Sequence, residues 1–298
     1  MNMKVDLCGV TLNNPVMTAS GTFGSGAEYA EFVDLNKLGA VVTKGVANVP
    51  WPGNPTPRVA EVYGGMLNAV GLQNPGIDLF VERDIPFLKQ FDTKIMVNVC
   101  GHSTEEYIEV VERLRDQPVD LLEINISCPN VKEGGIAFGQ DPKAVEAITK
   151  EMKKHAAQPV IMKLSPNVTD ITEMARAAEA GGADGLSLIN TITGMKIDIN
   201  RQKFVLANKT GGMSGPAIHP VAVRMVYQTA QAVRLPIVGM GGIMNAEDAI
   251  EMILAGATAV SVGTANFTNP HVTEEIVAGI RDYMERYQVA DIKDLVGA

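Results

Sequence analysis

The chain has 298 residues, of which 46% are hydrophobic and 20% charged, and its formal net charge is −9. This composition excludes a wholly disordered chain, and the negative charge argues against a protein that coats nucleic-acid backbones. No apolar run of transmembrane length occurs and the N-terminus has no apolar signal segment, so we expect a cytoplasmic protein.

In chain order, the first predicted element is a short hairpin at 4–12, and eight short strands follow it. The strands are rich in Val, Ile and Leu and do not alternate with polar residues, which is typical of parallel strands buried on both faces. Their predicted ranges are 15–19, 40–43, 95–99, 121–126, 160–164, 185–189, 237–240 and 259–262.

Predicted helices separate these strands and begin at capping signals such as Ser103 with Glu106, Asp141 before Pro142, and Asn245. Their ranges are 104–115, 142–156, 170–180, 246–254 and 272–286, with a less well-defined helix at 77–91. Eight such β–α units in about 250 residues or somewhat more predict a (β/α)8 TIM barrel. We expect one domain over 1–298. The pattern alone leaves an open doubly wound sheet as an alternative.

Two long connections, 46–76 and 191–216, each follow a predicted strand and are rich in glycine or proline. Irregular connections of this length in a compact domain are usually lids or binding loops. In a barrel, connections after strands lie on the catalytic face. We therefore expect two irregular binding loops on that face.

A polar residue or glycine lies at the C-terminal edge of every predicted strand, and in a closed barrel these positions converge on one pocket. They are Ser20, Lys44, Asn98, Asn125, Lys163, Asn190, Gly241-Gly242 and Gly263-Thr264. A lysine at the end of an apolar strand needs a negative partner, which an anionic ligand would supply. The glycine turns after the last two strands indicate a phosphate site.

A cysteine follows the fourth strand, in the turn Ser127-Cys128-Pro129-Asn130. At this position a thiol could act as a nucleophile or as a general base. No histidine is placed by the sequence as its activator. Cys8 and Cys100 are expected to be small buried hydrophobic residues, and the three separated cysteines cannot form a metal cluster. We expect no bound metal.

Five motifs together resemble the class 1 dihydroorotate dehydrogenases over essentially the whole chain. They are Asn125-Ile126-Ser127-Cys128-Pro129-Asn130, Thr43-Lys44-Gly45, Gly53-Asn54-Pro55-Thr56-Pro57-Arg58, Leu67-Asn68-Ala69-Val70-Gly71-Leu72-Gln73-Asn74-Pro75-Gly76 and Gly239-Met240-Gly241-Gly242-Ile243. Two further segments resemble class 1B, the catalytic subunit of the NAD-linked enzyme: Asn190-Thr191-Ile192-Thr193-Gly194-Met195 and Gly211-Gly212-Met213-Ser214-Gly215-Pro216.

The resemblance implies oxidation of (S)-dihydroorotate to orotate on FMN, in pyrimidine (UMP) biosynthesis. Cys128 would take the C5 proton, the C6 hydrogen would leave as hydride to the flavin, and Lys163 would stabilise the reduced flavin near N1. The implied flavin residues are Ser20, Lys44, Gly45, Asn98, Asn125, Lys163, Ile189 and Gly215, with Gly241, Gly242, Gly263 and Thr264 at the phosphate. The implied substrate residues are Lys44, Asn68, Ala69, Val70, Gly71, Leu72, Asn125, Asn190 and Thr191.

The resemblance also implies a partner subunit that carries FAD and a [2Fe–2S] cluster and passes electrons to NAD, on a homodimer core within a heterotetramer. Three alternatives stay open at the level of sequence. They are a class 1A-like homodimer that reduces fumarate, a non-redox phosphosugar lyase or isomerase on the same barrel, and a non-catalytic binding module. Each predicts a different outcome for fumarate turnover, flavin colour or the Cys128→Ser substitution.

Overall fold

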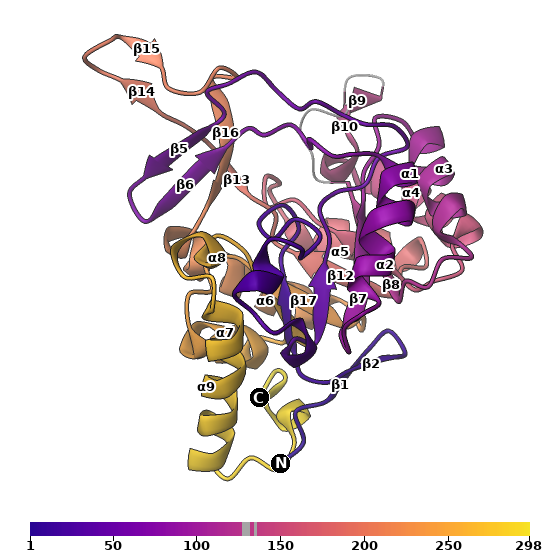
Figure 1. The fold of residues 1–298 in the computed structure, drawn as a ribbon, viewed down its shortest axis with the longest axis vertical. Coiled ribbons are helices and arrows are strands. Elements are labelled where there is room, and N and C mark those ends of the chain that lie inside the picture. Colours follow the sequence, from indigo (N-terminus) through magenta and orange to yellow (C-terminus); the bar gives the residue numbers. More distant parts are fainter. Residues whose placement is uncertain (127–131, 134–135) are drawn as a thin grey trace.

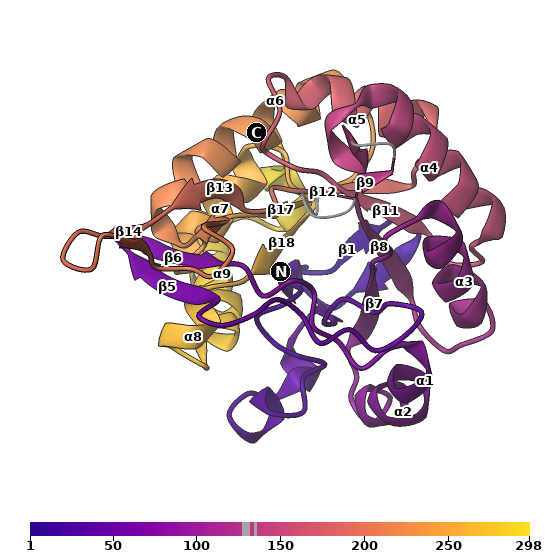
Figure 2. The ribbon, with the colours of Figure 1, turned by 90° about the horizontal axis from the view of Figure 1, so that it is seen from above.

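The computed structural model describes residues 1–126, 132–133 and 136–298. Within them, eight parallel strands close into a barrel whose spatial order follows the chain. Figure 2 shows this barrel from above, with helices around it. The predicted (β/α)8 barrel is confirmed, and each strand overlaps its predicted range: β3 (Val16–Thr18), β4 (Ala40–Val42), β7 (Lys94–Val99), β8 (Leu121–Asn125), β11 (Val160–Lys163), β12 (Gly185–Leu188), β17 (Ile237–Met240) and β18 (Ala259–Val262).

The helices pack their apolar faces on the outside of the barrel and begin at polar caps. The side chains of Ser103, Asp141 and Asn245 accept hydrogen bonds from backbone N–H groups of the first helical turn, which satisfies donors that would otherwise lack a partner. The predicted long helices are confirmed as α3 (Thr104–Leu114), α4 (Pro142–His155), α5 (Ile171–Ala180), α7 (Ala246–Leu254) and α9 (Val272–Arg286).

Two helical regions differ from expectation. The predicted helix at 77–91 is divided into α1 (Ile77–Leu79), a π-helical turn η3 (Phe80–Asp84) and α2 (Ile85–Leu88). Pro86, which has no N–H to donate, is the second residue after the π turn. Helix α6 (His219–Ala232) lies outside the predicted helices, because its valines have low helix propensity and the glycine-rich stretch before it hides its start.

The two long connections lie at the carboxyl ends of the barrel strands, and parts of both form regular strands. The first connection contains strands β5 (Val59–Val62) and β6 (Gly65–Asn68), and the second contains β13 (Ile192–Met195) and β16 (Thr210–Ser214). Strand β6 of the first connection pairs with β16 of the second. In the described chain they form one antiparallel sheet in the order β13-β16-β6-β5, which stands above the barrel in Figure 1. The expectation of irregular loops was wrong for these four strands, because their pairing joins segments far apart in sequence.

The remaining elements are an N-terminal hairpin and a set of short helices and strands. The predicted N-terminal hairpin is confirmed as β1 (Val5–Leu7) and β2 (Val10–Leu12), which lies near both termini at the bottom of Figure 1. Leu7 and Leu12 are fully buried there. The other short elements are η1 (Tyr29–Glu31), η2 (Leu35–Lys37), β9 (Lys132–Glu133), β10 (Ile136–Ala137), η4 (Phe138–Gln140), β14 (Ile197–Asp198), β15 (Lys203–Phe204), η5 (Pro216–Ile218), α8 (Ala265–Thr268) and η6 (Ile292–Leu295).

Candidate functional site

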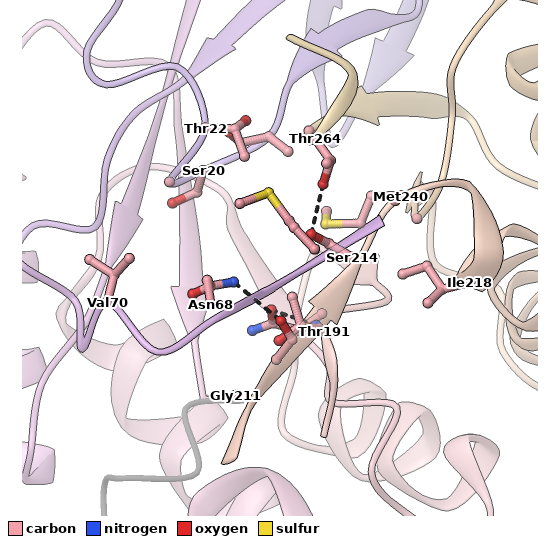
Figure 3. Close-up of a pocket in the computed structure, with 18 of the residues that line it drawn as sticks. Ser20, Thr22, Asn68, Val70, Thr191, Gly211, Ser214, Ile218, Met240 and Thr264 are labelled. Carbon is pink, nitrogen blue, oxygen red and sulfur yellow. Dashed lines mark hydrogen bonds between the residues drawn. The ribbon is translucent and has the colours of Figure 1, made fainter. Parts of the chain in front are cut away.

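A cavity of about 450 Å³ lies at the carboxyl ends of the barrel strands, beneath the four-stranded sheet. Its volume is in the range of sites that hold small molecules and cofactors. Figure 3 shows residues of both regions meeting in it, with Ser20 and Met240 from the barrel and Asn68 and Gly211 from the sheet. The barrel and the two long connections therefore build this site together.

Most of the residues predicted for the site line this one cavity. They come from seven barrel strand ends and from both long connections, so the closure of the barrel brings them together. The lining includes Ser20, Lys44, Asn68, Ala69, Val70, Gly71, Leu72, Asn125, Lys163, Ile189, Asn190, Thr191, Gly215, Gly241, Gly242, Gly263 and Thr264.

Two predicted flavin residues, Gly45 and Asn98, do not line the cavity. Asn98 is fully buried in β7. A Cβ added to Gly45 would lie 3.1 Å from Oδ1 of Asn98 and 3.3 Å from Sγ of Cys100, so Gly45 packs against both side chains behind the cavity wall. Cys128 lies outside the described residues, and its predicted role stays a prediction.

Asn125 occupies the end of β8 and is held from two sides. The hydroxyl of buried Tyr107 donates to the carbonyl oxygen of Asn125 at 2.7 Å. The amide of Asn190 lies 3.5 Å from Oδ1 of Asn125, and the backbone N–H of Thr191 donates to Oδ1 of Asn190 at 2.8 Å. These contacts join the ends of β8 and β12 into one polar wall.

The charged side chains that line the cavity are both cationic. Lys44 and Lys163 contribute to the lining, and the lining residues include no Asp or Glu within the described chain. In that same part of the chain, no group of three or more His, Cys, Asp or Glu residues is arranged to hold a metal ion. No described helix is long and apolar enough to span a membrane. Because both charged side chains that line the cavity are cations, the cavity is suited to an anionic ligand.

The glycine turns expose backbone at one end of the cavity. Gly241 and Gly242 have φ angles of +131° and +69°, and a Cβ on Gly242 would lie 2.8 Å from the carbonyl oxygen of Gly215. Only glycine fits such a left-handed, crowded position without strain. At Gly263 a Cβ would make ordinary contact with Ala19, 3.4 Å away. The two turns leave room for a group that approaches the backbone closely.

Several lining residues were not predicted from the sequence. Thr22, Ser214 and Asn167 contribute polar atoms to the cavity, and Thr264 donates a hydrogen bond to Ser214 at 2.7 Å (Figure 3). Asn167 donates to the carbonyl oxygen of Thr191 at 3.0 Å. Their sequence signal is weak, because short polar residues in turns are common for reasons unrelated to function.

A buried carboxylate, also not predicted, lies behind the lysine at the cavity floor. Oε2 of Glu123 accepts from Nδ2 of Asn98 at 2.6 Å and lies 3.3 Å from Nζ of Lys163. The side chain of Glu123 is 1% exposed. One signal was available in the sequence, since Glu123 is an acidic residue within the apolar run Leu121–Asn125.

Comparisons with known proteins identify the family of the chain. A family model described as dihydroorotate dehydrogenase matches residues 2–284. The chain is 72% identical to the dihydroorotate dehydrogenase B (NAD(+)) catalytic subunit of Lachnoclostridium phytofermentans, covering 100% of this chain and 99% of the relative. It is 65% identical to the protein of the same name from Alkaliphilus metalliredigens, again covering 100% and 99%.

A solved structure shares the fold. The crystal structure of DHODH from Eimeria tenella in complex with ferulenol aligns with a TM-score of 0.82 and 22% sequence identity. The alignment covers 99% of this chain and 88% of the other. At this identity the similarity concerns the barrel architecture.

Proposed function

We propose that this chain, which belongs to the dihydroorotate dehydrogenase family, oxidises (S)-dihydroorotate to orotate in pyrimidine biosynthesis, as the catalytic subunit of an NAD-linked enzyme. Close relatives that match its full length carry that name. The observation that carries the proposal is the cavity that unites two lysines, five asparagines and two glycine turns. A fumarate-reducing enzyme is not favoured, because the relatives are named as NAD-linked.

The residues of the cavity fit FMN as the bound cofactor. The glycine turns at Gly241-Gly242 and Gly263-Thr264 line the cavity, at Gly263 an added Cβ would lie beside the lining residues Ala19 and Thr22, and such turns suit a phosphate. Lys163 at the floor would face the part of the ring that gains negative charge. When bound, FMN supplies the hydride acceptor. Ser20, Ile189 and Gly215 would line the remainder of the cofactor, with Gly45 and Asn98 supporting it.

The residues of the first long connection would hold the substrate. Asn68 lines the cavity together with the backbone of residues 69–72, so carboxamide and N–H groups are available for the carboxylate and ring amides of dihydroorotate. Asn125, Asn190 and Thr191 would contact the substrate from the barrel side. Lys44 would contact both cofactor and substrate, and its charge suits the substrate carboxylate.

Cys128 is the proposed base. Removal of the C5 proton leaves the electron pair to form the ring double bond as the C6 hydrogen departs as hydride, so one proton and one hydride leave the substrate. A thiolate can accept that proton, whereas a serine hydroxyl at the same place is a far poorer base near neutral pH. Because an ordinary thiol has a pKa of about 8.5, turnover is expected to increase in mild alkali.

The electrons would then leave through a second subunit. The name of the relatives includes "catalytic subunit", which supports a partner. We propose that the partner carries FAD and [2Fe–2S] and passes electrons to NAD, and that two copies of this chain form the core of a heterotetramer. The present chain would be a single FMN-binding domain located in the cytoplasm. Co-purification with a flavin and iron–sulfur protein would test the partner.

The Cys128→Ser substitution tests the assigned chemistry. Wild-type protein should be yellow, and its flavin absorbance should bleach when dihydroorotate is added without oxygen. The Cys128→Ser variant should retain FMN but bleach at least about 100-fold more slowly at neutral pH, the range typical of a lost general base. Cys8→Ser, at the opposite end of the barrel, is the matched control and should bleach at the wild-type rate. An unchanged rate in Cys128→Ser would refute the role of the thiol, and a colourless protein would refute the use of FMN.

A further inference from the structure

We propose that Glu123 is a positioning residue that sets the charge at the floor of the cavity through Lys163, and that it thereby lowers the reduction potential of the cofactor bound above. This inference rests on the proposed function, because it requires a flavin next to Lys163. It concerns a residue that does not line the cavity itself.

The strand register places Glu123 one layer below the cavity floor. Glu123 of β8 is in register with Asn98 of β7 on one side and with Ile161 of β11 on the other. Lys163 is in register with Asn125, two residues further along each strand. Because side chains two residues apart point to the same face of a sheet, Glu123 and Asn125 both point into the barrel. Lys163 and Asn125 form the layer that faces the cavity.

The contacts connect these two layers. Oε2 of Glu123 receives the amide of Asn98 at 2.6 Å and the ammonium of Lys163 at 3.3 Å. The side chains of Lys163 and Glu123 are 5% and 1% exposed, so solvent screens their interaction little. Oε1 of Glu123 and Oδ1 of Asn98 are buried with no hydrogen-bond partner among the described residues. Among the described residues, the carboxylate of Glu123 therefore makes its hydrogen bonds through Oε2 alone, to Asn98 and to the lysine that lines the cavity.

Stability alone does not account for this carboxylate. The interior layers of such barrels are usually filled by branched apolar side chains. A buried ion pair offsets its own desolvation poorly and is often replaceable by apolar residues without loss of stability. The position of Glu123 next to a cation of the ligand cavity indicates instead a role in the electrostatics of that cavity.

The expected effect follows from charge balance. Reduction of the cofactor by hydride adds two electrons and one proton, so the cavity gains one negative charge. Lys163 stabilises that added charge, whereas Glu123 opposes it and cancels part of the field of the lysine. Removal of the negative charge at Glu123 should therefore make reduction easier, and removal of the positive charge at Lys163 should make it harder.

The test is the midpoint potential of FMN in purified, flavin-loaded protein. Glu123→Gln keeps the shape and the hydrogen-bonding capacity of the side chain but removes its charge. We expect this variant to have a higher midpoint potential than the wild type, by about 30 mV or more. A shift of about 30 mV corresponds to a tenfold change in a two-electron equilibrium. Lys163→Gln should change the potential in the opposite direction. Glu285→Gln, which removes one exposed charge from α9, should leave it unchanged.

Each result of this measurement either supports or overturns the proposed role of Glu123. A lower or unchanged potential in Glu123→Gln overturns the inference, because a purely structural carboxylate would at most misplace the lysine and lower the potential. If Glu123→Gln does not accumulate as folded protein, the same comparison is made between Lys163→Gln and the double variant Glu123→Gln/Lys163→Gln. The double variant should have the higher potential and, without FMN, the higher unfolding temperature. Failure of wild-type protein to bind FMN would instead contradict the proposed function.

Discussion

The ring of His219 is hydrogen-bonded to the glycine turn at one end of the cavity. Its Nδ1 lies 2.8 Å from the carbonyl oxygen of Gly241, and because a carbonyl can only accept, Nδ1 is the donor of this hydrogen bond. Nε2 lies 3.1 Å from a carboxylate oxygen of Glu251, so the ring is oriented from both sides. The side chain thus fixes the carbonyl of the turn whose N–H groups would hold the phosphate.

Replacement of His219 by leucine should weaken the binding of FMN. The change fills the buried position with an apolar side chain and removes the donor to Gly241. Loss of one such hydrogen bond costs about 1 kcal/mol, so the dissociation constant of FMN, measured by fluorescence titration, should rise about fivefold. The exposed His271 offers a matched control, and His271→Leu should bind FMN normally. Equal affinities in both variants would show that the ring does not support the turn.

Substitution by alanine should have different effects in the two glycine turns, on FMN affinity in one and on stability in the other. At Gly263 the nearest atoms to an added Cβ belong to the cavity-lining residues Ala19 and Thr22, at 3.4 Å or more. Gly263→Ala should therefore fold with a wild-type unfolding temperature and lose FMN affinity by steric exclusion. At Gly242 the added Cβ would lie 2.8 Å from His219 and from Gly215, at a φ of +69°. Gly242→Ala should be destabilised even without FMN, which differential scanning calorimetry can measure.

Substitution of Asn68 by alanine should weaken orotate binding. Asn68 lines the cavity from β6, and its amide lies 3.5 Å from the carbonyl oxygen of Gly212, a long contact that leaves the amide able to serve a ligand. Loss of a ligand hydrogen bond of about 1–2 kcal/mol should raise the dissociation constant by about 5–30-fold, as seen in orotate titrations of the flavin spectrum. Asn200→Ala, at the exposed tip of the β14–β15 hairpin, should bind orotate as wild type does.

The stability of the protein should depend on the titration of Cys8. Burial raises the pKa of this thiol from 9.0 to about 12, with added contributions from the negative charges of Asp184 and Asp6. Because the folded state holds the proton more tightly than the unfolded chain, the stabilisation is complete below about pH 9 and is lost as pH rises through about 12. The difference in unfolding free energy between wild type and Cys8→Ser should decrease by up to about 4 kcal/mol over this window. If the unfolding free energies of wild type and Cys8→Ser changed in parallel with pH, the raised pKa of Cys8 would be contradicted.

The sequence alone determined the positions of the barrel strands and most of the residues of the cavity. Strand and helix positions follow from local properties, namely the apolar runs and the caps at Ser103, Asp141 and Asn245, and local properties can be read without knowing the fold. Once eight parallel strands are assumed, the polar residues at their carboxyl ends must converge, so Lys44, Lys163 and the glycine turns were assigned to one pocket. The structure places them there.

The tertiary structure alone decided which distant segments pair. The sheet over the cavity joins Asn68 to Gly212 in register, and the ion pair beneath it joins Glu123 to Lys163. Both contacts connect residues far apart in sequence, so no local pattern encodes them. A glycine-rich connection appears irregular until its partner strand is known, and a buried carboxylate has no assignable role until its cation is found. The physical reason is the same in both cases: the energy of these groups depends on a partner that only the closed barrel brings within reach.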